Sequence, residues 1–128
     1  MSIDLKMLVW SVLLTVLQVV VAVLLGMSQV GFPALMGNRE NLPAFDGAAG
    51  RAHRAHRNML ESLVLFAALV LTAHAAGRAN ATTALGAQLF FWGRLAYAAI
   101  YIAGITWVRT AAWSVALLGL LMVASQLL

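Results

Sequence analysis

The amino-acid sequence predicts an all-α integral membrane protein, a bundle of four helices that run up, down, up and down through the bilayer. Of its 128 residues, 63% are hydrophobic and only 9% are charged, whereas about a quarter of the residues in a soluble domain are charged. The mean hydropathy is +0.93. Four long apolar stretches separated by short polar segments give the number of helices, and the length fits one domain over residues 1–128.

The first apolar stretch predicts a membrane helix over residues 5–27. No charged residue occurs between Met7 and Asn38, and this stretch is longer than the apolar part of a signal peptide, about 7–15 residues. We therefore expect a retained helix, since about 20 apolar residues cross a bilayer. The segment GFPALMGNRENLPAFDGAAG follows, and its prolines, glycines and mixed charges predict a loop.

The three remaining helices are expected over residues 50–76, 83–102 and 110–128. The connection GRANAT is a short polar turn, in which Asn80 or Thr82 is expected to cap the next helix. The segment GITWVR predicts a tight turn before the last helix. Connections this short make neighbouring helices antiparallel, and a helical bundle satisfies the backbone polar groups that lipid cannot.

The cations in the connections predict how the chain is oriented. The opposite side of the membrane carries only Lys6 and Arg78, whereas the first and third connections carry five arginines, Arg39, Arg51, Arg54, Arg57 and Arg109. Because positively charged loops stay in the cytoplasm, both termini are expected on the non-cytoplasmic side. Cations beside membrane segments favour anionic headgroups or an anionic small ligand as partners, and no nucleic acid is expected.

Polar residues on the second predicted helix are the first candidates for a site. Arg54, Asn58 and Glu61 are spaced i, i+4, i+7 and share one face, and Arg57 precedes Glu61 by four residues. Ionisable residues inside a membrane are costly and tend to be paired or functional. This stripe can hold a neighbouring helix, with Arg51 and Arg54 reaching lipid headgroups, or it can bind a polar ligand.

The third predicted helix adds a second polar face. Arg94, Tyr97 and Tyr101 are spaced i, i+3, i+7. Glu61 is the expected partner of Arg94, because the other carboxylates lie in a terminus or a loop, Asp4, Glu40 and Asp46. The two helices are thus expected to face each other through their polar sides. The tyrosines can instead be interfacial anchors, a role that fits the tryptophans better, Trp92, Trp107 and Trp113.

Arg109 begins the fourth predicted helix and is followed by Thr110. It is either an anchor at the cytoplasmic face or a cation that stabilises a bound thiolate, with a hydroxyl from Thr110 or Tyr101 donating to the same sulfur. The chain has no cysteine, so any thiol arrives with a ligand. No metal site is expected, because no third ligand is evident beside the histidines, His53, His56 and His74.

Two motifs resemble the MAPEG family, the membrane-associated proteins in eicosanoid and glutathione metabolism, which include microsomal glutathione transferases and prostaglandin E synthase. RAHRNMLES resembles the second-helix signature of that family, and GRLAYAAIYIAGITWVRTAAW resembles its third helix, tight turn and start of the fourth helix. The WVRT turn is similar to the bacterial branch. The resemblance implies a homotrimer in a bacterial inner membrane that binds glutathione, as co-substrate, between adjacent subunits near the cytoplasmic face.

The resemblance also implies an activity and its residues. The activity is that of a glutathione S-transferase or glutathione-dependent peroxidase acting on small lipophilic electrophiles that enter from the bilayer. Arg109, Thr110 and Tyr101 are implied to be catalytic. The implied glutathione-binding residues are Arg54, Arg57, Asn58, Glu61, Arg94, Tyr97, Tyr101, Arg109 and Trp113. The chain departs from the family pattern in its first helix, which has no arginine and only Gln18 as a strongly polar interior residue.

Two other functions stay open on the sequence alone. A non-catalytic binding or scaffold protein of the same fold would use Arg57, Glu61 and Arg94 as a structural network. A small-molecule transporter of this size usually carries an acidic residue midway along its first helix, and residues 7–38 contain none.

Overall fold

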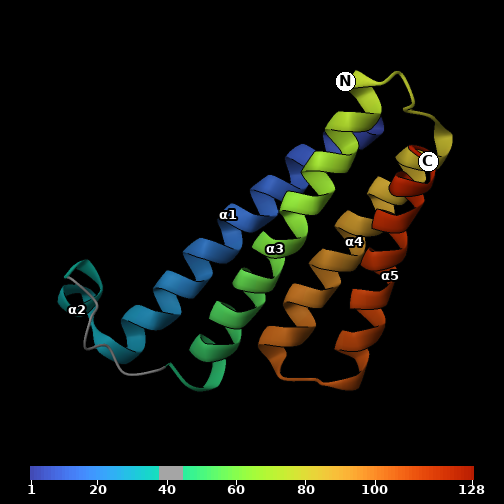
Figure 1. Cartoon of the computed structure of the whole chain (residues 1–128). Coiled ribbons are helices and arrows are strands. Elements are labelled where there is room, and N and C mark those ends of the chain that lie inside the picture. The colour runs from blue at the N-terminus through green and yellow to red at the C-terminus, as the bar shows by residue number, and fades with distance from the viewer. Residues whose placement is uncertain (38–44) are drawn as a thin grey trace.

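The computed structural model describes residues 1–37 and 45–128, and all regular structure in these ranges is helical (Figure 1). The helices are α1 (Ile3–Val30), α2 (Phe32–Met36), α3 (Gly47–Ala75), α4 (Ala81–Ala103) and α5 (Trp107–Ser125). Each of the four expected helices is present. The fifth, α2, is a single short helix with a proline in its first turn, in a segment where we expected only a loop. Arg39 and Glu40 lie outside the described residues.

Three of the described helices, α1, α3 and α5, are long and apolar enough to cross a membrane. With 23 residues, α4 is about 34 Å long, which also exceeds an apolar core of about 30 Å. Gln88 and Arg94 lower its hydropathy, so α4 is not among the three. A fourth span therefore remains a prediction.

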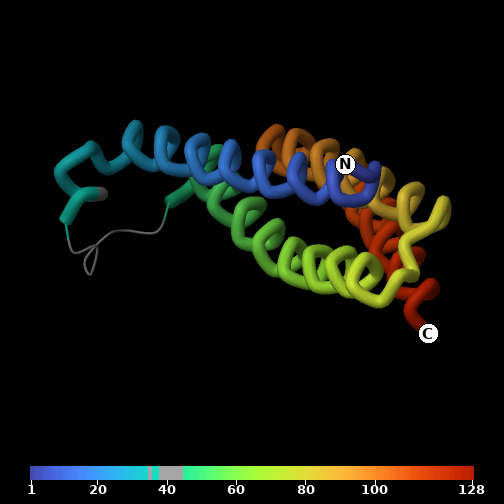
Figure 2. Tube along the Cα trace, turned by 90° about the horizontal axis from the view of Figure 1, so that it is seen from above, coloured from blue at the N-terminus to red at the C-terminus, as the bar shows by residue number. Residues whose placement is uncertain are grey.

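The four long helices alternate in direction, as expected. Figure 1 shows α1 beside α3 and α4 beside α5, and Figures 1 and 2 place both termini at the same end of the bundle. The turn between α4 and α5 and the N-terminus of α3 lie at the opposite end. The stretch of three arginines that opens α3 and the arginine that opens α5 are thereby brought to one end.

Polar side chains cap both ends of α4. Asn80 caps its start, because the Asn80 side-chain oxygen accepts from the backbone N–H groups of Thr82 and Thr83 at 2.9 and 3.0 Å. This confirms Asn80 of the two expected caps. At the other end, the Arg51 Nε donates to the Ile102 carbonyl at 2.9 Å. Arg51 thus satisfies a carbonyl that the helix end leaves open, instead of only reaching toward headgroups.

Close backbone contact fixes α4 against α5. A Cβ atom added at Gly93 would lie 2.8 Å from the backbone nitrogen of Ala116, and one at Gly86 would lie 2.6 Å from the carbonyl oxygen of Gly119. Small residues allow membrane helices to approach this closely. On the other side of α4, the buried rings of Phe66 and Phe90 stack with centroids 4.0 Å apart and join α3 to α4.

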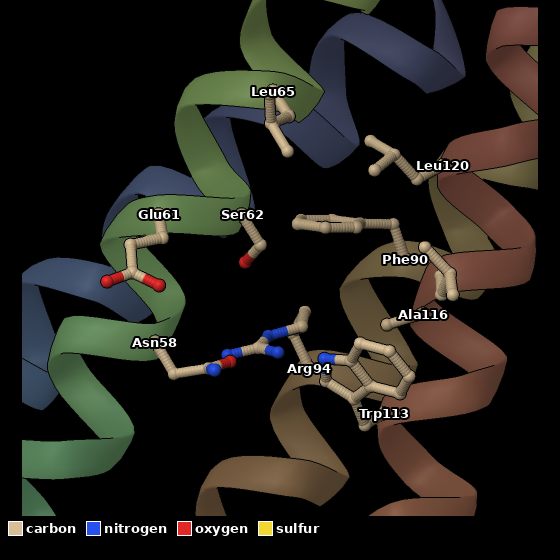
Figure 3. A pocket seen from close by; sticks show the side chains of 10 residues that line it. Asn58, Glu61, Ser62, Leu65, Phe90, Arg94, Trp113, Ala116 and Leu120 are labelled. Carbon is tan, nitrogen blue, oxygen red and sulfur yellow. The ribbon is translucent and has the colours of Figure 1, made fainter.

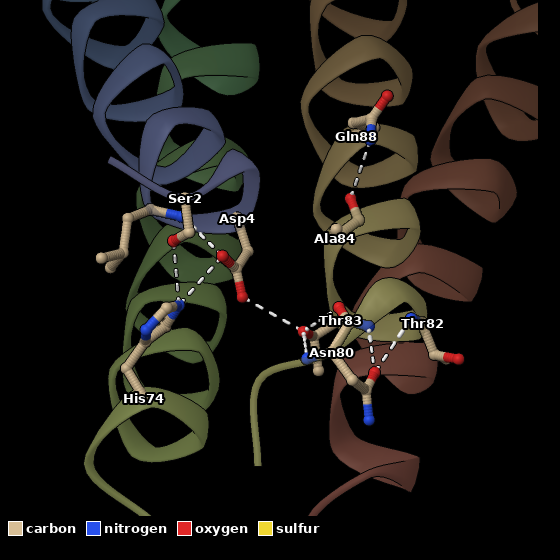
Figure 4. Close-up of polar contacts among 9 residues, drawn as sticks. Ser2, Asp4, His74, Asn80, Thr82, Thr83, Ala84 and Gln88 are labelled. Atoms are coloured by element: carbon tan, nitrogen blue, oxygen red, sulfur yellow. Dashed lines mark hydrogen bonds and ion pairs between the residues drawn. The ribbon is translucent and has the colours of Figure 1, made fainter. Parts of the chain in front are cut away.

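A buried carboxylate joins three helices at the end where the termini lie (Figure 4). Asp4 belongs to the first turn of α1 and is 2% exposed, whereas we expected it in the N-terminal tail. Its Oδ1 lies 2.9 Å from Nε2 of His74 on α3, and its Oδ2 accepts a hydrogen bond of 3.1 Å from the Thr83 hydroxyl on α4. The start of the chain is therefore part of the bundle.

Candidate functional site

Three arginines and two tyrosines gather where the C-terminal half of α4 meets α3 and α5. Arg94, Tyr97 and Tyr101 come from the predicted polar face of α4, Arg54 from α3 and Arg109 from α5. The short turn after α4 places Arg109 next to Tyr101, although seven residues lie between them in the sequence. The i, i+3, i+7 spacing on α4 thus predicted the face correctly, and the fold supplies the other two cations.

Aromatic faces hold these guanidinium groups in place. The Cζ atom of Arg94 lies 4.3 Å from the ring centroid of Tyr97, and that of Arg109 lies 4.5 Å from the ring centroid of Tyr101. The two tyrosine rings are 5.5 Å apart. Arg54 donates from Nε to the Tyr101 hydroxyl at 3.1 Å. Cations at these distances are attracted by the negative face of the ring. The cluster is therefore a continuous series of cations and rings.

Arg94 is the most deeply buried member, with 1% of its surface exposed. Its Nε and Nη2 atoms have no hydrogen-bond partner among the residues that the structure describes. A buried cation is ordinarily paired, because leaving water without compensation is costly. The described chain therefore leaves these two nitrogen atoms without a hydrogen-bond acceptor.

The expected ion pair between Arg94 and Glu61 does not form within one chain, and neither does an Arg57–Glu61 pair. Arg57 and Glu61 are both exposed. In Figure 3 the Asn58 amide extends toward the Arg94 guanidinium and the Glu61 carboxylate does not. The two side chains are in different surroundings, because Glu61 is exposed on α3 whereas Arg94 is enclosed between the helices.

A cavity of about 230 Å³ opens between α3 and α5 beside Arg94 (Figure 3). Its polar lining consists of Asn58, Glu61, Ser62 and Arg94. Its remaining lining is apolar and consists of Leu65, Phe90, Trp113, Ala116, Leu117 and Leu120. A site of this kind can hold a ligand that has both anionic and apolar parts.

A second cavity, of about 190 Å³, lies beside Arg109 and is lined by Tyr97, Arg109, Thr110 and Trp113. Trp113 lines both cavities and so forms a wall that they share. Arg109 and the Thr110 hydroxyl offer a cation and a hydrogen-bond donor to the same small space. An anionic sulfur or oxygen atom is the chemical group that this pair suits.

Most of the predicted site residues therefore lie near one another, and one does not. Five form the cluster, Thr110 and Trp113 join it at the second cavity, and Asn58 and Glu61 line the first. Arg57 is exposed and lines neither cavity. The apolar wall was not predicted from the sequence, because Leu65, Phe90 and Leu117 look like any lipid-facing or core residue. Ser62 was also missed, although it follows Glu61 directly.

Comparison with known proteins agrees with the two sequence motifs. A sequence model described as the MAPEG family matches residues 7–128, nearly the whole chain. No curated protein and no solved structure matches the chain.

Proposed function

Because this chain belongs to the MAPEG family, we propose that it is a membrane glutathione S-transferase or glutathione-dependent peroxidase that acts on small lipophilic electrophiles. One observation carries the proposal. Three guanidinium groups gather at one end of the bundle and contact two tyrosine side chains, and none forms an ion pair with a described carboxylate. Such a cluster attracts a ligand with several negative charges.

Glutathione matches this cluster in charge, since it is a tripeptide with two carboxylates, one amine and one thiol. Arg54, Arg57 and Arg94 bind the carboxylates, to which a guanidinium can donate two parallel hydrogen bonds. The Asn58 amide adds donors and an acceptor, and Glu61 accepts from the amine. Tyr97 and Trp113 complete the binding surface around the peptide.

The thiol is placed beside Arg109 in this proposal. A nearby cation lowers the pKa of a thiol, and the thiolate is the reactive nucleophile. The thiol proton leaves to water, and a hydroxyl from Thr110 or Tyr101 donates to the sulfur. In conjugation, a carbon–sulfur bond forms while the leaving group departs with its bonding electrons. In peroxide reduction, the thiolate attacks one peroxide oxygen, an alcohol leaves, and a second glutathione yields the disulfide and water.

The lipophilic substrate is accommodated by the apolar wall of the first cavity. Leu65, Phe90, Leu117 and Leu120 line this cavity together with Arg94 and Asn58. An electrophile that partitions into the bilayer can approach between α3 and α5 without crossing water. The volume of about 230 Å³ favours a small substrate over a long eicosanoid chain.

The exposed charges on α3 support assembly into a homotrimer. Glu61 lies 14 residues after Gly47, about 21 Å along a helix that is apolar enough to cross a membrane. Charged side chains at such depth face protein or a water-filled space. A second copy of the chain is the proposed cover for Arg57 and Glu61, and glutathione then binds between subunits.

The proposed location is a bacterial inner membrane, with both termini outside the cytoplasm. Arg51, Arg54 and Arg109 lie at the end of the bundle opposite to the termini, so the cation cluster belongs to the cytoplasmic face under the positive-inside rule. Cytoplasmic glutathione then has direct access to the site.

The test uses purified protein in detergent. Adding millimolar glutathione is expected to produce thiolate absorbance and to raise the melting temperature, because a ligand that binds only the folded state stabilises it. A panel of an aryl halide, an epoxide and a lipid hydroperoxide then separates conjugation from peroxide reduction. A non-catalytic scaffold is expected to give no thiolate absorbance and no rise in melting temperature. A transporter is expected to move a substrate across the membrane without forming any conjugate or reduced product.

A further inference from the structure

We propose that Tyr101 is a positioning residue that holds the guanidinium groups of two arginines in place, each through a different part of its side chain. Its ring face fixes the guanidinium of Arg109, and its hydroxyl fixes that of Arg54. This inference rests on the proposed function, in which Arg109 serves the thiol and Arg54 a carboxylate of glutathione. It assigns the hydrogen bond to the sulfur to Thr110 instead of Tyr101.

The geometry separates the two contacts. The Arg109 Cζ lies 4.5 Å from the ring centroid, a distance typical of a cation over an aromatic face. The Arg54 Cζ is further from the centroid, at 5.9 Å, while its Nε donates to the hydroxyl oxygen at 3.1 Å. Arg109 is therefore held by the ring and Arg54 mainly by the hydroxyl.

Tyr101 is itself held firmly enough to position other groups. It lies in the last turn of α4, which ends at Gly104 with φ +85°. The Gly104 N–H donates to the Tyr101 carbonyl at 3.0 Å, and the Arg51 Nε donates to the Ile102 carbonyl. The ring also packs 5.5 Å from that of Tyr97. The backbone that carries Tyr101 is thus fixed from two sides.

An aromatic ring positions a cation without cancelling its charge. A carboxylate in the place of Tyr101 would hold both arginines but would neutralise one of them, and it would repel an anionic ligand. A tyrosine leaves two full positive charges directed at the ligand. Because Arg54 comes from α3 and Arg109 from α5, one side chain sets the spacing between the carboxylate-binding and the thiolate-binding cations.

Two variants separate the two contacts. Tyr101→Phe keeps the ring and removes the hydroxyl, so KM for glutathione is expected to rise about 3- to 10-fold, the effect of losing one hydrogen bond of ordinary strength. The thiolate fraction at saturating glutathione is expected to stay within about twofold, because Arg109 keeps its ring. Tyr101→Leu removes both contacts. The pH profile of thiolate formation is therefore also expected to shift upward, by about one pH unit.

Trp92→Phe is the matched control, an aromatic substitution on an exposed part of α4 outside the cluster, and it is expected to behave like the natural chain. If Tyr101→Phe loses thiolate formation as fully as Tyr101→Leu, the hydroxyl acts on the sulfur directly and the inference is wrong. It is equally wrong if Tyr101→Leu leaves thiolate formation unchanged.

A readout without glutathione keeps this inference apart from the proposed function. The melting-temperature changes of Tyr101→Phe and Arg54→Gln in detergent are expected to be non-additive when combined, because each substitution removes the same hydrogen bond. Tyr101→Leu and Arg109→Gln are also expected to be non-additive, because each removes the same contact between cation and ring. Additive changes in both cycles contradict the positioning role, whereas coupled changes in a protein that forms no thiolate contradict the proposed function alone.

Discussion

Arg94 and Glu61 line the same cavity, yet no ion pair joins them. Arg94 is enclosed between helices and rests on the ring of Tyr97, whereas Glu61 is exposed on α3. The guanidinium is thus held by an aromatic face and keeps its full charge, and two of its nitrogen atoms remain without a described partner. In the proposed function, an anionic ligand would supply the hydrogen-bond acceptors that the described chain does not.

Replacing Arg94 by Met is expected to separate stability from ligand binding. Methionine is apolar and uncharged, and it removes a buried cation whose transfer out of water is costly when no counter-charge accompanies it. The melting temperature of the ligand-free variant in detergent is therefore expected to equal or exceed that of the natural chain. Its further rise with glutathione is expected to be lost.

Arg57→Met is the matched comparison, since Arg57 is an exposed arginine on α3 that lines neither cavity. It is expected to weaken glutathione binding less than Arg94→Met does. A strongly destabilised Arg94→Met protein would show that Arg94 already has a counter-charge, most simply Glu61 of a neighbouring subunit.

Arg109→Gln is expected to reduce thiolate formation at neutral pH by about tenfold or more, because an adjacent cation shifts a thiol pKa by one or more units. The fold is expected to persist, since Arg109 is only partly buried in the first turn of α5. Thiolate absorbance at saturating glutathione, measured against pH, gives the result. Arg109→Lys keeps the charge but not the planar group. Its thiolate titration is expected to fall between those of the natural chain and Arg109→Gln. Equal titrations for all three proteins would remove Arg109 from this role.

Much of the fold follows from composition and short motifs. The apolar lengths predict the four long helices within a few residues, and the local pattern of Asn80 predicts its cap. The small helix α2 could not be predicted, because a helix of five residues that includes a proline is too short to show helical periodicity. The role of Asp4 could not be predicted either, since its partners His74 and Thr83 are 70 and 79 residues away and no local pattern links them.

The sequence predicted which residue types form the site better than it predicted which of these side chains contact each other. The spacing of Arg94, Tyr97 and Tyr101 predicts a shared face, and the helices bring Arg54 and Arg109 to it. The prediction that Glu61 pairs with Arg94 was wrong within one chain. Spacing along a helix predicts only the face on which a side chain lies. It does not say whether a neighbouring ring or a carboxylate is closer.

Gly93→Ala is expected to destabilise the pairing of α4 with α5. The added methyl group would lie 2.8 Å from the Ala116 nitrogen, and that atom is backbone and cannot rotate away. Overpacking of this kind typically costs about 1–3 kcal/mol. Melting in detergent is the measurement, and Gly37→Ala is the control, because its nearest heavy atom would be at an ordinary 3.5 Å. Equal effects of the two substitutions would mean that the helices can separate at little cost.

Asp4→Ala is expected to loosen the end of the bundle where the termini lie. It removes the carboxylate acceptor of the Thr83 hydroxyl, which still has the Asn80 carbonyl at 2.9 Å, and it removes the contact to His74. The loss of a typical hydrogen bond costs about 0.5–1.5 kcal/mol. Lys6→Ala, an exposed substitution on the same helix, is the control for the loss of a charge. Hydrogen exchange in the first turns of α1 and α4 is expected to rise in Asp4→Ala only. Because the arginine cluster lies at the far end, thiolate formation is expected to be retained. A loss of thiolate formation without faster exchange would contradict the purely structural role given to Asp4.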